Sequence, residues 1–414
     1  MAGRSGRPPE PERRGGMSEE RLWQVGFVVG SVIGAAVTVA GRQIERSARE
    51  AGLVDWQRVE DIAIARLRRA PGALTEAELA ATEEAYAEAM ARVVPALGAH
   101  LGTELPGVVE RVSVVDRAGW VQANTTAFAG LIGRLEGDLL EQMLPPGSGF
   151  TKAAVTLANR WITTRQLGLL LGFMGQRVLG QYDLALLTAE TTPGRLLFVE
   201  ENIRQTATSL GVPLGPFRTW IALHETTHAF EFEAHPWLRP YLADRLERQL
   251  TLFSHGASSI GRDAARALGS ALRGDGRRDD QHWMEYLMTD EQRALFRETQ
   301  AVMSLLEGFG DHVMDAVGKD LVPGVERISA RFHGRREQRT TFERAMLRIT
   351  GMDLKMEQYR KGEAFVAGIE QRAGAVALRR LWDGPETLPT AAEIDDPGAW
   401  VRRMGLNQLG GGGS

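Results

Sequence analysis

Apolar residues recur three and four positions apart along most of the chain, which is the spacing of helices. Thr75 is followed three residues later by Glu78, and this pairing predicts a capping box at a helix start. The chain is therefore expected to be mainly helical. Helical spacing covers residues 54–101, 151–180, 217–232, 237–253, 291–318, 320–332, 336–349 and 354–372.

Three short runs interrupt this spacing and predict strands. The first lies within residues 111–128, where a β-branched run leads through a turn into a helix. Residues 182–187 and 195–200 are the other two, joined by a loop that contains Pro and Gly. The pattern predicts an α+β fold that is predominantly helical, with a small sheet directly upstream of the helix over 217–232.

Glycines break the apolar surface of the helix predicted over residues 151–180. Gly168, Gly172 and Gly175 follow one another at spacings of four and three residues. We interpret them as a smooth face where another helix crosses closely, within a helix that is buried along its length.

Composition divides the chain into four parts. Residues 1–20 begin with a run rich in Arg, Pro and Gly and are predicted to be a disordered extension. Residues 21–50 form a glycine-rich apolar helix, residues 51–405 form the main domain, and residues 406–414 form a flexible tail.

The apolar helix has two interpretations. Residues 22–41 carry no charge, and a helix of that length spans about 30 Å, the thickness of a bilayer core. Arginines that follow the segment would then hold the main domain on the cytoplasmic side of a membrane. The many glycines equally suit a buried helix within a soluble protein. Both interpretations predict a cytoplasmic location, with membrane association in the first.

Charge and cysteine content narrow the chemistry. The net charge is −4, which favours no nucleic-acid partner. Cysteine is absent, so the chain has no disulfide and no thiolate nucleophile. Any metal ion must therefore be held by histidines and carboxylates.

The stretch "WIALHETTHAFEF" supplies such ligands within one predicted helix. His224 and His228 are four residues apart, so both project from the same helical face and can bind one ion. Glu225 projects beside them, where it can reach a water on the metal without becoming a ligand. This HExxH pattern is typical of zinc peptidases, with two zinc ligands and a general base.

A catalytic zinc needs a third protein ligand. The extended pattern HExxHxxGxxH fails here, because Glu231 replaces its glycine and Ala234 its last histidine. The alternative is a glutamate from a later helix, and "MSLLEGFGDHVMD" offers Glu307, with Asp311 one turn further on to accept a hydrogen bond from a ligand histidine. The competing candidates for the third ligand are Glu231, Glu233, His282 and His312.

These residues predict a hydrolytic mechanism. Zinc would activate a water molecule and polarise the substrate carbonyl, while Glu225 would act as the general base. Tyr359 or His312 would then stabilise the developing oxyanion.

Beyond these motifs, several longer segments of the chain resemble a family of bacterial zincin-like proteins. Members of that family are regarded as zinc-dependent metalloproteases or as hydrolases associated with biosynthesis of the deazaflavin coenzyme. The resemblance implies a zincin-type catalytic core inside a mostly helical domain. It also implies that His224, His228 and Glu307 bind zinc and that Glu225 is catalytic. His235 stands where a small polar residue is expected, which argues against a ligand role. The matching segments are "VDWQRVEDIA" (54–63), "VVDRAGWVQANTTAF" (114–128), "LGQYDLAL" (179–186), "RLLFVEENI" (195–203), "FRTWIALHETTHAFEFEAHPWLR" (217–239), "MSLLEGFGDHVMD" (303–315) and "MDLKMEQYRKGEAFV" (352–366).

Three functions fit this sequence. The leading one is a zinc-dependent metallopeptidase or amide hydrolase that acts on a peptide or small amide. The second is a zincin-like protein that binds a metal or a partner without turnover. The third is a small-molecule amidase linked to deazaflavin coenzyme biosynthesis. The sequence indicates neither the substrate nor the oligomeric state.

Overall fold

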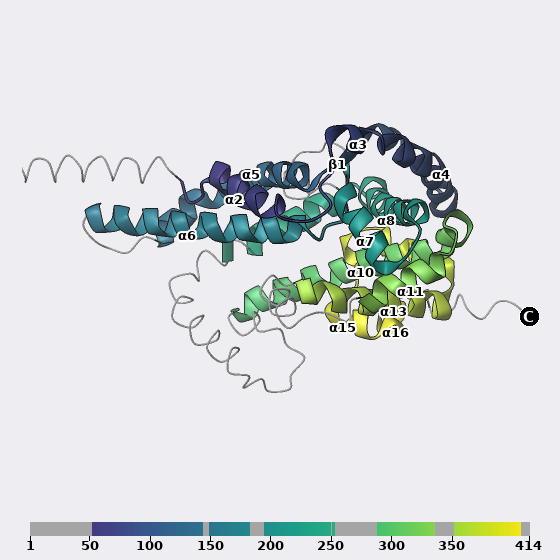
Figure 1. The fold of residues 1–414 in the computed structure, drawn as a ribbon. Coiled ribbons are helices and arrows are strands. Elements are labelled where there is room, and N and C mark those ends of the chain that lie inside the picture. The colour runs from purple at the N-terminus through teal and green to yellow at the C-terminus, as the bar shows by residue number, and fades with distance from the viewer. Residues whose placement is uncertain are drawn as a thin grey trace, which may run out of the picture. The chain divides into compact units, whose positions relative to one another are not determined.

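The computed structural model describes residues 52–143, 149–182, 194–249, 251–252, 288–335 and 352–406. Helices dominate these residues and surround one small sheet, which confirms the predicted α+β, mainly helical fold (Figure 1). Residues 1–51 and 407–414 lie outside the described residues, as do the apolar segment 22–41 and the predicted helix over 336–349. None of the helices described is long and apolar enough to cross a membrane. The elements used below are α2 (Trp56–Leu67), α3 (Glu76–Ala80), α4 (Glu83–Leu101), β1 (Val112–Val115), α5 (Arg117–Met143), α6 (Gly149–Gly175), β2 (Gly180–Tyr182), β3 (Leu196–Val199), α7 (Glu200–Leu210), α8 (Leu214–Ala234), α10 (Asp290–Leu321), α11 (Val325–Arg335), α13 (Met352–Ala373), α14 (Ala375–Arg379), α15 (Ala391–Asp395) and α16 (Pro397–Arg403).

The sheet has three strands in the order β1-β3-β2. β1 runs parallel to the central strand β3, and β2 runs antiparallel to it as an edge strand. Leu196 and Phe198 of β3 enter one hydrophobic cluster, whereas Leu197 and Val199 enter a second one. Because both faces of β3 are buried, its sequence is continuously apolar instead of alternating.

The helix α8 lies at the centre of the larger cluster. It packs against α4, α10 and the edge strand β2. Most of its side chains are buried, including Phe217, Leu223 and Phe230. A helix with this many buried positions is held by packing on several sides, so its histidines have a rigid support.

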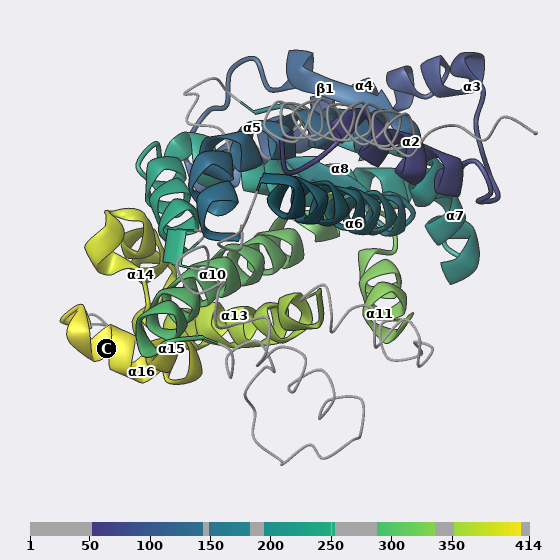
Figure 2. The same cartoon turned by 90° about the vertical axis from the view of Figure 1, so that its left-hand side faces the viewer.

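The helices α10 and α13 lie side by side in both views (Figures 1 and 2). Their backbones meet at Gly308 and Gly362, where a Cβ atom on either residue would collide with the backbone of the other helix. The absence of a side chain at both positions lets the two helices approach this closely. The partner glycine on α13 could not be identified from the sequence.

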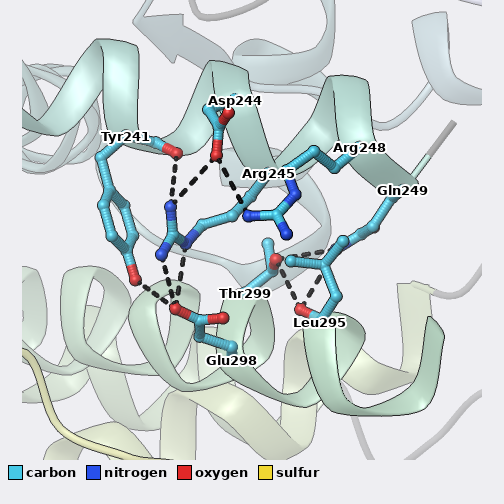
Figure 3. Close-up of polar contacts among 8 residues, drawn as sticks. All are labelled: Tyr241, Asp244, Arg245, Arg248, Gln249, Leu295, Glu298 and Thr299. Carbon is cyan, nitrogen blue, oxygen red and sulfur yellow. Dashed lines mark hydrogen bonds and ion pairs between the residues drawn. The ribbon is translucent and has the colours of Figure 1, made fainter. Parts of the chain in front are cut away.

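A polar cluster joins the helical residues 238–249 to the first half of α10 (Figure 3). Arg245 stacks over the ring of Tyr241 at 3.4 Å, and its Nη2 donates to Oε1 of Glu298 at 2.6 Å. Gln249 donates to the hydroxyl of Thr299 at 2.7 Å. These contacts fix the helix that follows α8 onto the helix that carries Glu307.

The glycine face predicted on α6 is confirmed. A Cβ atom on Gly168 would lie 2.7 Å from Cβ of Ile62, and one on Gly172 would lie 3.2 Å from Cα of Ala63, so α6 crosses α2 at these glycines. The prediction that this helix is buried along its length was wrong, because Trp161 is 65% exposed and Ile162 is 45% exposed. Only the face with the glycines packs against α2.

Some element boundaries also differ from the prediction. The strand expected over residues 182–187 begins earlier, at Gly180, and residues 183–193 lie outside the described residues. The helix expected at 320 begins at Val325, because α10 extends to Leu321 and Gly324 adopts a φ of 73°. Val322 ends α10 in an extended conformation, and the left-handed Gly324 then turns the chain into α11.

Candidate metal centre

His224 and His228 share one face of α8, as their spacing predicts. Their rings lie 4.8 Å apart between centroids in an edge-to-face arrangement. Trp220 stacks on His224 from one turn earlier, at 6.4 Å between centroids. The Nδ1 atom of His224 lies 3.2 Å from Sδ of Met314, which belongs to α10.

Glu307 reaches the two histidines from α10 and is 3% exposed. Its Oε2 atom lies 3.8 Å from Nε2 of His228. One donor atom from each of His224, His228 and Glu307 lies within 4.8 Å of the others. Gly310 lies next to His228, and a Cβ atom there would make an ordinary van der Waals contact with Cε1 of that histidine at 3.6 Å. The structure thus brings together the three residues that the sequence predicts as metal ligands.

Glu231 fixes the orientation of His228. Its Oε2 atom lies 2.7 Å from Nδ1 of His228, three residues earlier on α8. With Nδ1–H donating to this carboxylate, Nε2 is the nitrogen directed at Glu307. Sequence reasoning treated Glu231 only as a competing ligand, although the i,i+3 spacing on one helix could have indicated this contact.

Glu225 is held by the edge strand β2. The backbone N–H of Tyr182 donates to its Oε2 atom at 3.1 Å, and the carboxylate is largely buried. Gly180 makes room for the side chain, because a Cβ atom there would lie 2.5 Å from Cγ of Glu225. The sequence indicated the carboxylate but neither of the two strand residues that position it.

The electrostatic environment of His228 is strongly negative. Burial alone lowers the pKa of His228, but Glu231, Glu307 and Glu225 outweigh it and raise that pKa to about 9. Burial also raises the pKa of the Glu231 carboxyl, because a charge is costly in this interior. The three carboxylates thus favour a positive charge at the histidine, whether a proton or a metal ion supplies it.

The donor set fits zinc. Two imidazoles and one carboxylate are the protein ligands of many hydrolytic zinc sites, which keep a further position open. Zinc–ligand bonds of about 2.1 Å in a tetrahedron set the donor atoms about 3.4 Å apart. The 3.8 Å between His228 and Glu307 is close to that separation. Glu231 in addition has its Oε1 atom buried without a hydrogen-bond partner among the described residues, so the cluster has excess acceptor capacity.

Several competing ligand candidates have other partners. Both oxygens of Glu233 accept hydrogen bonds from Arg111, at 2.5 and 2.9 Å. His235 caps the end of α8 and stacks on Trp382 at 4.8 Å, which agrees with the expectation that it is not a ligand. Nδ1 of His312 lies 3.8 Å from the carboxylate of Glu370 on α13.

The proposed roles of three further residues stay predictions. Asp311 lies one turn beyond Glu307 on α10 and is half-buried, and its role in orienting a ligand histidine is untested. Tyr359 lies on α13, with its side chain outside the described residues, and His282 lies outside them altogether.

Two comparisons with known proteins found similar proteins. A family model described as a zincin-like metallopeptidase matches residues 54–401. Among solved structures, the chain is similar to a protein from Chloroflexus aurantiacus that is provisionally described as a hydrolase with a novel fold. The two share 36% sequence identity with a TM-score of 0.61, and the match covers 85% of this chain and 99% of the other. No curated protein matches the chain.

Proposed function

The chain belongs to the zincin-like metallopeptidase family, and we propose that it is a zinc-dependent hydrolase of peptide or amide bonds. His224, His228 and Glu307 would hold the metal. The observation that carries this proposal is the convergence of these three donors from two helices, with Glu225 next to the first of them in sequence. The likeness to a protein described as a hydrolase supports the same reaction class.

The chain's own residues supply the rest of the mechanism. When bound, zinc supplies Lewis acidity, which polarises a carbonyl and lowers the pKa of a water molecule. We assign proton transfer to Glu225, which accepts a proton from the attacking water and delivers it to the leaving amine. Its attachment to the edge strand supports this role, because a general base must be held within hydrogen-bond reach of the proton it removes.

Glu231 keeps His228 in the tautomer that a metal requires. A ligand histidine must present an unprotonated nitrogen to the ion, and a carboxylate on its other nitrogen ensures this. Tyr359 remains our candidate donor to the developing oxyanion. Its helix, α13, packs against the helix that carries Glu307.

The intact Glu225 favours catalysis over a purely metal-binding role. A protein that only binds metal needs the two histidines and Glu307, but it has no use for a buried carboxylate beside them. Burying that group costs free energy, which a catalytic role would justify.

The experiment combines zinc analysis with an activity assay. Elemental analysis should find one zinc per chain in both the wild type and Glu225→Gln. A library of quenched fluorescent peptides should be cleaved by the wild type, and the variant should be slower by about 10²–10⁴-fold, the usual contribution of a general base. A chelator should abolish cleavage, and added zinc should restore it.

Other results would change the conclusion. Zinc in both proteins without cleavage of any peptide would favour a small-molecule amide or a binding role. Equal cleavage by the wild type and Glu225→Gln would remove Glu225 from the mechanism. Absence of zinc from the purified protein, with no uptake on addition, would contradict the proposed function itself.

A further inference from the structure

One cavity is lined by none of the residues of the metal centre. It has a volume of about 730 Å³ and is lined by the end of α2, the segment after α6 and part of α7. None of these elements supplies a proposed zinc ligand. Small-molecule sites typically have volumes of about 300–1,000 Å³, so the cavity is large enough for a metabolite-sized ligand.

The lining of this cavity is basic. Arg66, Arg69 and Arg177 all contribute to it, and none of the described residues that line it is acidic. This local excess is not a property of the whole chain, whose net charge is −4. Three guanidinium groups around one cavity create a positive local potential, which favours the binding of an anion.

Two of the arginines are held in place by the fold. The side chain of Arg66 passes over Gly172, where a Cβ atom would lie 2.9 Å from its Cδ. The guanidinium of Arg177 stacks on Phe173 at 3.7 Å, and its Nη1 donates to the carbonyl of that residue at 3.1 Å. A ligand would therefore meet partly pre-organised donors, which lowers the entropy cost of binding.

The lining also has unused donor capacity. The Nε atom of Arg66 is buried and has no hydrogen-bond partner among the described residues. Gln205 already uses its Oε1 atom to accept from Nη2 of Arg117 at 2.7 Å, so its remaining polar group is the donor NH₂. Buried donors of this kind are normally satisfied, so an acceptor is expected in the cavity.

We propose that this arginine-lined cavity binds a small anionic molecule that carries a phosphate group or a pair of carboxylates. Guanidinium groups recognise both through paired, charge-assisted hydrogen bonds. The acidic group would contact Arg66, Arg69 and Arg177, and the remaining volume would accommodate the rest of the ligand. This site is separate from the proposed zinc centre and does not depend on the proposed hydrolytic function.

The test is calorimetric titration of the full-length, zinc-loaded protein at fixed ionic strength. Ribose 5-phosphate and succinate are the two probes, and they distinguish the phosphate from the dicarboxylate. At least one should bind, and Arg66→Gln/Arg69→Gln should weaken its binding about tenfold or more, as expected for lost bonds to a charged group. Arg68→Gln is the matched control, because Arg68 lies between the two but does not line the cavity.

Three results would overturn the proposal. Failure of both probes to bind at millimolar concentration would leave the cavity without an anion function. Equal weakening of binding by the double variant and by Arg68→Gln would indicate that general surface charge attracts the probe. Unchanged binding in the double variant would locate the anion elsewhere, such as at the zinc. If the double variant does not fold, the single variant Arg69→Gln takes its place in the same titration. Its side chain is exposed, so this substitution should leave the fold intact.

Discussion

Two clusters of buried carboxylates differ in what balances their charge. At the start of α7, Glu200 is fully buried and accepts hydrogen bonds from Arg204 at 2.7 Å and from Arg218 at 3.2 Å. At the metal centre, Glu231 and Glu307 lie against the imidazole of His228 instead. The two clusters share a helix, because Arg218 and His228 both lie on α8.

The difference separates a structural cluster from a functional one. A guanidinium is always charged and cannot release its proton, so the chain itself neutralises Glu200. An imidazole can lose its proton and then bind a metal through the freed nitrogen. Carboxylates around histidines therefore leave room for an exchangeable cation, whereas carboxylates around arginines do not.

The largest expected effect is that of removing the carboxylate ligand. We expect Glu307→Ala to lose zinc almost completely while keeping its fold, because it removes one of three ligands. The loss of zinc affinity should be larger than about 10–100-fold, which is the usual loss when a residue that hydrogen-bonds to a metal ligand is removed. Zinc titration against a competing chelator measures it, with circular dichroism as the check on folding.

Glu298→Ala is the matched control for this variant. It removes a carboxylate from the same helix, but one that is bonded to Arg245 and Tyr241 at the surface (Figure 3). It should keep its zinc. If Glu307→Ala retained wild-type affinity, the cluster would not be the zinc site and the comparison would fail.

The arginine-balanced cluster should respond in the opposite way. We expect Glu200→Gln to lower the free energy of unfolding by about 3–5 kcal/mol, because it leaves the largely buried guanidinium of Arg218 without its carboxylate. Zinc per folded chain should be unchanged. Urea unfolding and elemental analysis of the same sample test both statements, and a stable variant that had lost its zinc would contradict the distinction.

Local spacing accounts for what the sequence could predict at the site. His224 and His228 follow from the four-residue repeat of a helix, and their apolar neighbours indicate that this helix is buried. Glu307 came from a motif on a distant helix, so the sequence could offer it as a candidate without showing that it reaches the histidines. That convergence depends on how α10 packs against α8.

The missed residues act through contacts that leave no pattern in one sequence. Gly180 and the backbone N–H of Tyr182 hold Glu225 from a three-residue strand that is too short to show alternation. Gly362 meets Gly308 across two helices, and nothing near either glycine indicates the other. Glu231 was visible in the sequence but was considered only as a competing ligand, because its contact with Nδ1 of His228 depends on side-chain geometry.

The edge strand provides the next test, since it acts on Glu225 without touching the proposed ligands. In Gly180→Ala, the new Cβ would lie 2.5 Å from Cγ of Glu225 and displace the carboxylate. A shift of about 1 Å in a catalytic group can cost about 10²-fold in rate, so kcat should fall by that order with zinc retained. Peptide cleavage and zinc analysis of one preparation measure both quantities.

Gly215→Ala is the control for this substitution. Gly215 lies in the first turn of α8 and has nothing within 4 Å of an added Cβ, so activity should be unchanged. Wild-type kcat in Gly180→Ala would show that the edge strand does not position the general base.

The smallest expected effect concerns Glu231, which orients a proposed ligand without being one. We expect Glu231→Gln to bind zinc about 10–100-fold more weakly than the wild type, the usual cost of losing a carboxylate behind a ligand histidine. Competition titrations at several pH values measure it. Glu233→Gln, two residues further along α8, is the control, because Glu233 is bonded to Arg111 instead.

The pH dependence makes this prediction sharper, because Glu231 has two opposing effects on zinc binding. It orients His228, but together with Glu307 and Glu225 it raises the pKa of that histidine to about 9, so zinc must displace a proton below that pH. The zinc affinity of the wild type should therefore rise about tenfold per pH unit up to about pH 9 and then level off. In Glu231→Gln the pKa of His228 is lower, so the rise should end at a lower pH. The deficit of the variant should then be largest above pH 9 and shrink as the pH falls, whereas a deficit independent of pH would show that Glu231 does not control the proton on His228.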